Sequence, residues 1–264
     1  MSIQELERAV LSENPEAALM AQQVGPAANP KLSALAANGN PKVRLTAINA
    51  LRETGAPAPE VFAAAVRDPD PQVRGAALAG LWEKPSPQAA DAVLEALHAS
   101  QDPDARRELA LIAAACAGEG ADAGVRSRVT QSLTNRRKYE KEPLAREGLG
   151  AALGKLGDAD AQKEFAAGLT ASSDRDRARY LEECQAVHQP WLLPPLSLVL
   201  ADTSPMVRIG IDARPDLPHY LRACDLAAKL IVSIAKPKLS FDPEKVINYT
   251  PPQLDEVRAA ARAR

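Results

Sequence analysis

The sequence contains few aromatic residues and few cysteines, and both shortages narrow the class of protein. Aromatics make up 3% of the 264 residues, so strand formers are scarce and helix is favoured. The three cysteines, Cys116, Cys184 and Cys224, lie far apart, form no CxxC pair and are odd in number. They predict small buried side chains in a reducing compartment and no disulfide framework.

A surplus of positive charge and a long apolar run are also missing. The formal net charge is −2, from 32 Lys and Arg against 34 Asp and Glu, which argues against general nucleic-acid binding. The longest apolar stretches, residues 192–201 and 226–235, are only about half as long as a helix that spans a bilayer. The first ten residues carry no signal-peptide pattern. We therefore expect a cytoplasmic protein without a membrane partner.

Alanine and proline are in excess, with 52 and 22 residues, and they occur in a repeated segment. Residues 38–51 read NGNPKVRLTAINAL and residues 68–81 read DPDPQVRGAALAGL. A strong copy follows at residues 202–211, and weaker copies lie at residues 102–115, 141–154 and 173–186. The aligned arginines are Arg44, Arg74, Arg107, Arg146, Arg179 and Arg208. Their spacing of 29 to 39 residues predicts a solenoid.

Each copy predicts a pair of antiparallel helices. Proline stands three residues before the arginine in the clear copies, as Pro41 and Pro71 do, and begins a helix where no N–H is needed. Asparagine or an acidic residue stands six residues before the arginine, in the loop, as Asn38 and Asp68 do. An apolar segment at helical spacing, such as residues 59–68, precedes the loop. One pair cannot bury its own apolar face, so we expect the pairs to stack, with alanine and glycine where helices cross.

The pattern D-x-x-P-x-V-R-x-x-A-x-x-A-L resembles the second helix of HEAT repeats, particularly the short bacterial kind, over residues 30–215. This resemblance implies an all-α fold. The expected architecture is a right-handed α-α superhelix, the HEAT-like solenoid of the ARM type, with about six helix pairs between terminal caps.

Three regions are predicted on this basis. Residues 1–37 are expected to form N-terminal capping helices, residues 38–215 the HEAT-like repeats and residues 216–264 a C-terminal capping segment. The last region resembles the closing segment of some bacterial HEAT-repeat proteins, with a helix near residues 217–235 and a final helix from residue 253. The side chains expected to cover the last repeat are Phe241, Val246, Ile247 and Tyr249.

Sequence motifs for catalysis and for cofactors are missing. The chain has no HExxH, paired CxxC, GxxxxGK[ST], GxGxxG or GxSxG motif, and its three histidines are far apart. It also lacks the His-Glu dipeptides that bind iron in HEAT-like deoxyhypusine hydroxylases. We therefore predict no enzyme activity, no metal and no cofactor.

Two HEAT-like enzyme families stay open as alternatives. Phycobilin lyases and isomerases of this architecture are likewise acidic, alanine-rich and of this length. Alkylpurine DNA glycosylases line their concave face with basic residues and tryptophan, and this chain offers Trp82, Trp191 and a basic segment. The net negative charge and the scarcity of aromatics count against the glycosylase.

The basic residues receive two interpretations. The repeated arginines are expected to tie neighbouring loops together, which makes Arg44, Arg74 and Arg208 predicted stability residues. The basic segment at residues 125–146 coincides with the longest repeat spacing and predicts a lengthened loop that docks an acidic partner. A solvated loop without a partner is the alternative. If the segment docks a partner, its candidate binding residues are Arg126, Arg128, Arg136, Arg137 and Lys138.

The concave face of the solenoid is the other predicted binding site. In HEAT-like solenoids the second helices line this face, so residues one, two, five and eight places after each arginine are expected there. The candidates are Thr46, Asn49, Arg52, Trp82, Glu108, Ile112, Glu147 and Tyr180. Such a small, mildly apolar stripe suits a peptide or a helix better than a polyanion. Trp82 and Tyr180 are the candidate anchors, and packing between repeats is the alternative for each.

Taken together, these patterns predict a non-catalytic scaffold or adaptor for protein–protein interaction that binds a peptide or protein in the concave groove. An inhibitor or immunity-type protein that clasps one partner fits the same features. The partner stays open, because the repeat architecture hosts many functions.

Overall fold

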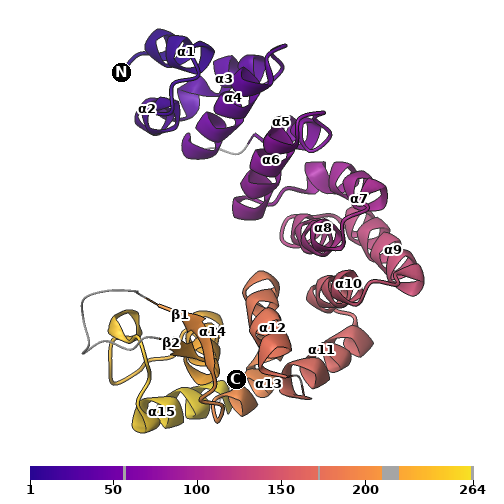
Figure 1. Cartoon of the computed structure of the whole chain (residues 1–264), viewed down its shortest axis with the longest axis vertical. Helices are drawn as coiled ribbons and strands as arrows, with labels where there is room; N and C mark the ends of the chain where they lie inside the picture. The colour runs from indigo at the N-terminus through magenta and orange to yellow at the C-terminus, as the bar shows by residue number, and fades with distance from the viewer. Residues whose placement is uncertain (56–57, 172, 210–219, 263–264) are drawn as a thin grey trace. The chain divides into compact units, whose positions relative to one another are not determined.

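The structure, a computed structural model, describes residues 1–55, 58–171, 173–209 and 220–262. Over these residues the chain consists mainly of helices joined by short loops, which confirms the predicted all-α solenoid (Figure 1). It divides into two compact units, Met1–Ala152 and Leu153–Arg264. The handedness of the superhelix and the three predicted regions stay predictions.

The first unit stacks helices in two layers. In one layer α4, α6 and α8 follow one another, and in the other α5, α7 and α9 do (Figure 1). Its α-helices are α1 (Ile3–Leu11), α2 (Ala17–Val24), α3 (Asn29–Leu35), α4 (Pro41–Glu53), α5 (Pro59–Ala65), α6 (Pro71–Glu83), α7 (Ala90–Ala99), α8 (Pro103–Cys116), α9 (Ala123–Tyr139) and α10 (Pro143–Lys155), the last of which extends past the division. The 3-10 turns η1 (Gly25–Ala28) and η2 (Pro87–Ala89) precede α3 and α7.

Proline and a polar cap set where the second helices begin. Pro41 and Pro71 occupy the first helical position of α4 and α6, as predicted. The side chain before each proline, Asn40 or Asp70, accepts a hydrogen bond from the backbone N–H two residues further on, at 3.0 or 2.8 Å. These bonds satisfy N–H groups that a helix leaves unpaired at its start.

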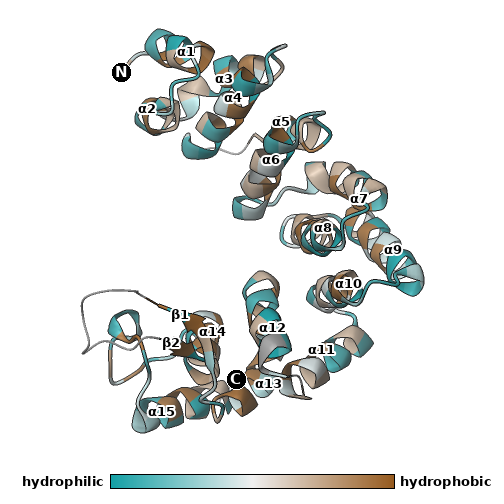
Figure 2. Cartoon of the chain, viewed as in Figure 1, coloured by the Kyte–Doolittle hydropathy of each residue, from teal (hydrophilic) through white to brown (hydrophobic). Residues whose placement is uncertain are grey.

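The core is made of small and aliphatic side chains on one face of each helix. In α4 the buried residues include Val43, Ala47, Ile48 and Leu51, which recur at helical spacing. In Figure 2 hydrophobic residues, in brown, and hydrophilic residues, in teal, accordingly occur on the same helix. The three cysteines are free and buried, as predicted. Burial raises the pKa of Cys116 to about 11, so this thiol stays protonated.

Glycine allows helices to approach closely, as predicted. A Cβ atom at Gly148 of α10 would lie 2.5 Å from Cγ and 2.9 Å from Cα of Arg107 in α8. We expect Gly148→Ala to lower the free energy of unfolding by about 1–3 kcal/mol, because backbone atoms must move apart. Urea unfolding followed by circular dichroism measures this change.

A matched control is Gly75→Ala, at an exposed helical site in α6 where a Cβ meets no atom within 4 Å. This variant should be stabilised by about 0.5–1 kcal/mol, because alanine has the better helix propensity. Equal effects of the two substitutions would contradict the close approach at Gly148.

The second unit combines helices with a two-stranded antiparallel sheet. Its elements are α11 (Ala159–Ala171), α12 (Asp174–Val187), η3 (Pro190–Leu192), α13 (Leu193–Val199), β1 (Pro205–Arg208), β2 (Tyr220–Arg222), α14 (Ala223–Ala235), η4 (Pro243–Lys245) and α15 (Pro251–Arg262). The Phe165 ring packs edge to face against Tyr180 and Trp191, at centroid distances of 5.1 and 5.7 Å. Lys155 Nζ donates to the carbonyl oxygens of Ala186 and Val187, at 2.6 and 3.0 Å. These bonds satisfy carbonyl groups at the C-terminal end of α12.

The segment predicted as the last repeat is not a helix. Residues 205–208 form β1, which pairs antiparallel with β2 and sets Val207 opposite Leu221 and Arg208 opposite Tyr220. The prediction was wrong because β-branched and aromatic side chains across the pair favour a strand over the helix that Pro205 would start. Arg208 is exposed and provides no buried tie. The helix expected near residues 217–235 begins at Ala223, and residues 210–219 lie outside the described residues.

The predicted basic loop is also a helix. Residues 123–139 form α9, which has 17 residues. Asp122 caps it by accepting the N–H of Val125 at 2.8 Å. The buried side chains of α9 are Val129 and Leu133 alone, so its apolar face was too narrow to be recognised as helical from the sequence.

Candidate functional site

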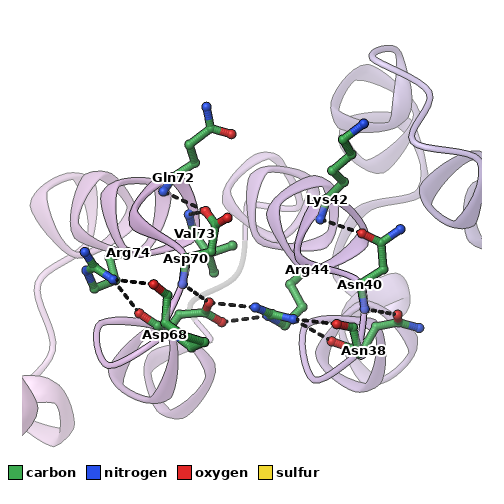
Figure 3. Close-up of polar contacts among 11 residues, drawn as sticks. Asn38, Asn40, Lys42, Arg44, Asp68, Asp70, Gln72, Val73 and Arg74 are labelled. Carbon is green, nitrogen blue, oxygen red and sulfur yellow. Dashed lines mark hydrogen bonds and ion pairs between the residues drawn. The ribbon is translucent and has the colours of Figure 1, made fainter.

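Arg44 of α4 joins two successive repeats (Figure 3). Its Nε and Nη2 donate to the carboxylate of Asp68 at 2.7 and 2.8 Å, and its Nη1 donates to the carbonyl oxygens of Asn38 and Gly39 at 2.9 and 3.1 Å. The hydrogen bonds from Arg44 hold the pKa of Asp68 below its ordinary value. The arginine of one repeat therefore binds the acid in the loop of the next, which confirms the predicted structural role.

Arg74 occupies the corresponding position in α6, but among the described residues it bonds only its own loop and not an acid of the next repeat. Its Nη1 donates to the carbonyl oxygens of Asp68 and Pro69, at 2.8 and 2.9 Å, within its own loop. Among the described residues no acidic side chain forms an ion pair with Arg74. Ser100 occupies the loop position where an acid would stand.

In the third repeat the tie is made by Arg106, and not by Arg107 as predicted. Arg106 Nε and Nη2 donate to the Glu140 carboxylate at 2.9 and 3.0 Å, and its side chain is 6% exposed against 3% for Glu140. Since α8 begins at Pro103, the position three residues later is residue 106. The prediction was one residue off because it aligned Arg107 with the other arginines, whereas Ala105 and Arg106 occupy the places of the valine and the arginine in the other copies.

Glu140 receives further donors. Arg136 Nη2 lies 3.3 Å from it, and the backbone N–H groups of Lys141 and Glu142 donate to Oε1, both at 3.1 Å. Burial raises the pKa of Glu140, but the hydrogen bonds from Arg106 and the backbone outweigh burial, so the pKa lies below its ordinary value.

In the fifth copy the tie is made by Arg177, and the prediction of Arg179 was wrong by two residues. Arg177 Nη1 is hydrogen-bonded to the carboxylate of Asp202. Arg179 Nη1 instead pairs with Asp176 on its own helix, at 3.1 Å. Because α12 begins at Asp174, residue 177 takes the place that Arg44 has in α4.

The first two clear repeats share a surface, which we call the α4/α6 surface and define as Thr46, Asn49, Arg52, Trp82 and Glu83. Arg52 of α4 forms an ion pair with Glu83 of α6, and its Nη1 donates to Asn49 Oδ1 at 3.5 Å. Trp82, the residue before Glu83 in α6, is 41% exposed, although tryptophan is usually well buried.

The remaining concave-face candidates separate into different environments. Glu108 is exposed and Glu147 is half-buried. Ile112 is 0% exposed, so its prediction as a surface contact is wrong. Leu111, which stands five residues after Arg106, is buried as well, so this part of α8 lies in the core whichever arginine is aligned. Tyr180 is half-buried and packs against Phe165, so the structure places it between α11 and α12.

Most basic side chains of α9 are bound within the first unit. Arg126 donates to two carbonyl oxygens at the end of α8, at 3.3 and 3.2 Å. Arg128 lies 3.6 Å from Asp91, and Arg136 pairs with Glu140.

The end of α9 is the more accessible part. The guanidinium of Arg137 lies against Gly150 of α10. Lys138 and Tyr139 are exposed, and Lys138 Nζ lies 5.6 Å from the centroid of the Tyr139 ring.

Asp225 is a buried acid that sequence reasoning missed. It is 0% exposed and accepts hydrogen bonds from the backbone and side chain of Arg222, from Asn248 Nδ2 and from the Tyr249 N–H, all between 2.7 and 2.9 Å. Burial raises its pKa, but these hydrogen bonds outweigh burial and hold the pKa below its ordinary value. An aspartate within the apolar run ACDLAAKLIVSIA was the available signal, since a buried charge needs partners.

The arrangement of α5 to α9, with a proline-started second helix and an arginine tie, matches a known family. Residues 58–140 match the family model described as HEAT repeats. This part of the chain carries HEAT repeats. HEAT repeats generally serve as protein-interaction scaffolds, and folds of this kind are typically non-catalytic. No curated protein sequence matches the chain.

Within the described part of the chain, no group of three or more His, Cys, Asp or Glu is arranged to hold a metal ion. None of the described helices combines the length and apolar character needed to cross a bilayer. Trp191, which the glycosylase alternative requires at a surface, packs against Phe165, and its ring lies close to Gly154.

Proposed function

We propose that the chain is a non-catalytic scaffold or adaptor that binds a peptide or protein on the α4/α6 surface. The observation that carries this proposal is the exposed indole of Trp82 on the second helix of a HEAT repeat. Tryptophan is the residue most enriched among interface hot spots. The Arg52–Glu83 ion pair, whose acid follows Trp82 in the chain, and Asn49 are the polar groups expected at the rim of such an anchor.

Substitution of Trp82 tests the proposal. Proteins captured from native extract by the wild-type chain should be lost with Trp82→Ala. For a partner so identified, this substitution should weaken binding by more than about 1 kcal/mol in calorimetry, because the anchor is removed. Thermal unfolding should stay close to wild type, since the side chain is 41% exposed.

Leu19→Ala is the matched control, because Leu19 lies in the same unit and is 57% exposed. Its partners should match those of the wild type. If Trp82→Ala unfolds the protein while the folded fraction still binds, Trp82 is a packing residue and the α4/α6 surface is not the site.

The exposed end of α9, with Lys138 beside Arg136 and Arg137, is proposed as a second contact for an acidic partner. Lys138→Glu is the informative change. Arg136 forms an ion pair with the buried Glu140, so replacing Arg136 would also disturb the fold. Loss of the captured partner with Lys138→Glu would support this contact, and unchanged capture would restrict binding to the α4/α6 surface.

A further inference from the structure

A cavity of about 540 Å³ lies in the second unit, beside the end of α14. One half of its lining comes from one face of α14, at Lys229, Val232 and Ser233, and from Lys236, the residue that caps the end of this helix. The other half comes from the segment that follows α14, namely Pro237, Pro243, Glu244 and Tyr249. This volume lies within the range of small-ligand sites.

The side chain of Tyr249 has a buried polar atom without a hydrogen bond. It is 2% exposed, and its hydroxyl oxygen is buried without a hydrogen-bond partner, although buried tyrosine hydroxyls are usually bonded. Its N–H donates to Asp225 at 2.8 Å, its carbonyl oxygen accepts from Arg222 at 2.7 Å, and its ring lies edge to face with Phe241 at 6.0 Å. The hydroxyl is thus held in place, and a bound ligand would satisfy it.

The charges around the cavity select the class of ligand. Lys229 and Lys236 are exposed and form no ion pair within the described residues, and Glu244 adds one carboxylate. One negative charge balances this lining, whereas a dianionic phosphate would exceed it. Burial raises the pKa of Tyr249, and the negative charges of Asp225 and Glu244 raise it further, so the phenol stays protonated and is a donor.

We propose that this cavity binds a carboxylate, which accepts a hydrogen bond from the Tyr249 hydroxyl and is balanced by Lys229 and Lys236. Val232, Pro237 and Pro243 provide an apolar wall for the carbon chain that carries the carboxylate. A small organic acid and an acidic side chain of a peptide share this chemistry. The site is independent of the α4/α6 surface.

Butyrate and its neutral analogue butyramide are the first probes. With ¹³C-tyrosine-labelled full-length protein, the Tyr249 ring signals should shift saturably with butyrate and stay in place with butyramide. The double variant Lys229→Gln, Lys236→Gln should weaken butyrate binding by about tenfold. Lys245→Gln is the matched control, because Lys245 belongs to the same segment but pairs with Asp242 at 3.2 Å and does not line the cavity.

Tyr249→Phe separates binding from folding. It removes only the oxygen that lacks a partner, so the melting temperature should not fall, whereas butyrate affinity should fall by about fivefold. Butyrate binding unchanged by Tyr249→Phe, or equal binding of butyrate and butyramide, would overturn the proposal.

Blocked tripeptides distinguish the two sources. If Ac-Ala-Glu-Ala-NH₂ binds more tightly than butyrate and Ac-Ala-Gln-Ala-NH₂ does not bind, the ligand is an acidic peptide side chain. If butyrate binds and neither peptide does, it is a small acid. Equal binding of the two peptides would show that the carboxylate is not recognised.

Discussion

Replacing Arg106 by alanine is expected to lower the free energy of unfolding by about 3 kcal/mol, the lower end of the range for removing one partner of a buried ion pair. The substitution leaves Glu140 with a side chain that is 3% exposed and without its bidentate partner. Arg136 and two backbone N–H groups still face the carboxylate, which limits the loss. Chemical denaturation at neutral pH measures it.

The matched control is Arg74→Ala, at the corresponding position of α6. Arg74 bonds only carbonyl oxygens of its own loop among the described residues, so its loss should cost less, about 1 kcal/mol. If the two variants are equally unstable, the ion pair with Glu140 contributes nothing beyond the loop bonds.

The Arg106 effect should also depend on pH. The pKa of Glu140 is lower in the folded protein than its ordinary value. Its contribution is therefore fully present above the unfolded pKa and is lost as the pH falls through the folded pKa. Wild type and Arg106→Ala should differ most at neutral pH and converge in acid.

Asp225→Ala is expected to be the most damaging change in the second unit, at about 3–5 kcal/mol. It removes the acceptor of five hydrogen bonds and leaves the guanidinium of Arg222, Asn248 Nδ2 and the Tyr249 N–H without it. These bonds connect α14 to the segment that leads into α15. The expected result is loss of cooperative thermal unfolding in the second unit, measured by calorimetry.

Asp255→Ala provides the matched control. Asp255 also pairs with an arginine three residues away, Arg258, but its side chain is 72% exposed. Exposed pairs of this kind contribute about 0–1 kcal/mol. A loss with Asp255→Ala as large as with Asp225→Ala would contradict the importance of burial.

The repeat pattern predicted the first unit well because its signals are local. A proline at the first helical position and a cap before it act within one turn, so the sequence indicates where α4 and α6 begin. The alignment through Arg107 instead of Arg106 was wrong because two adjacent arginines fit the spacing. Pro103, three residues before Arg106, was a local signal for the right one, and the bond to its partner Glu140 confirms it. That partner is distant in the sequence.

The second unit was harder to predict because its contacts are not local. The strand at residues 205–208 depends on pairing with residues 220–222, and strand preference depends on the partner more than helix preference does. The site residues show the same limit: Trp82 was recognised from its place in a helix, whereas the cavity at Tyr249 needs segments that only the fold brings together.

The missing acid opposite Arg74 affects how the array comes apart. Stacked repeats behave as a one-dimensional chain whose cooperativity is set by each nearest-neighbour interface. Arg44 and Arg106 each form a bidentate ion pair across the interface between repeats. Among the described residues, Arg74 forms no such pair at the junction between α6 and α8. Partial opening should begin at this seam, so that α1 to α6 fluctuate as one foldon and α7 to α9 as another. Trp82 lies at the end of the first foldon, so this local opening would change the shape of the proposed α4/α6 surface.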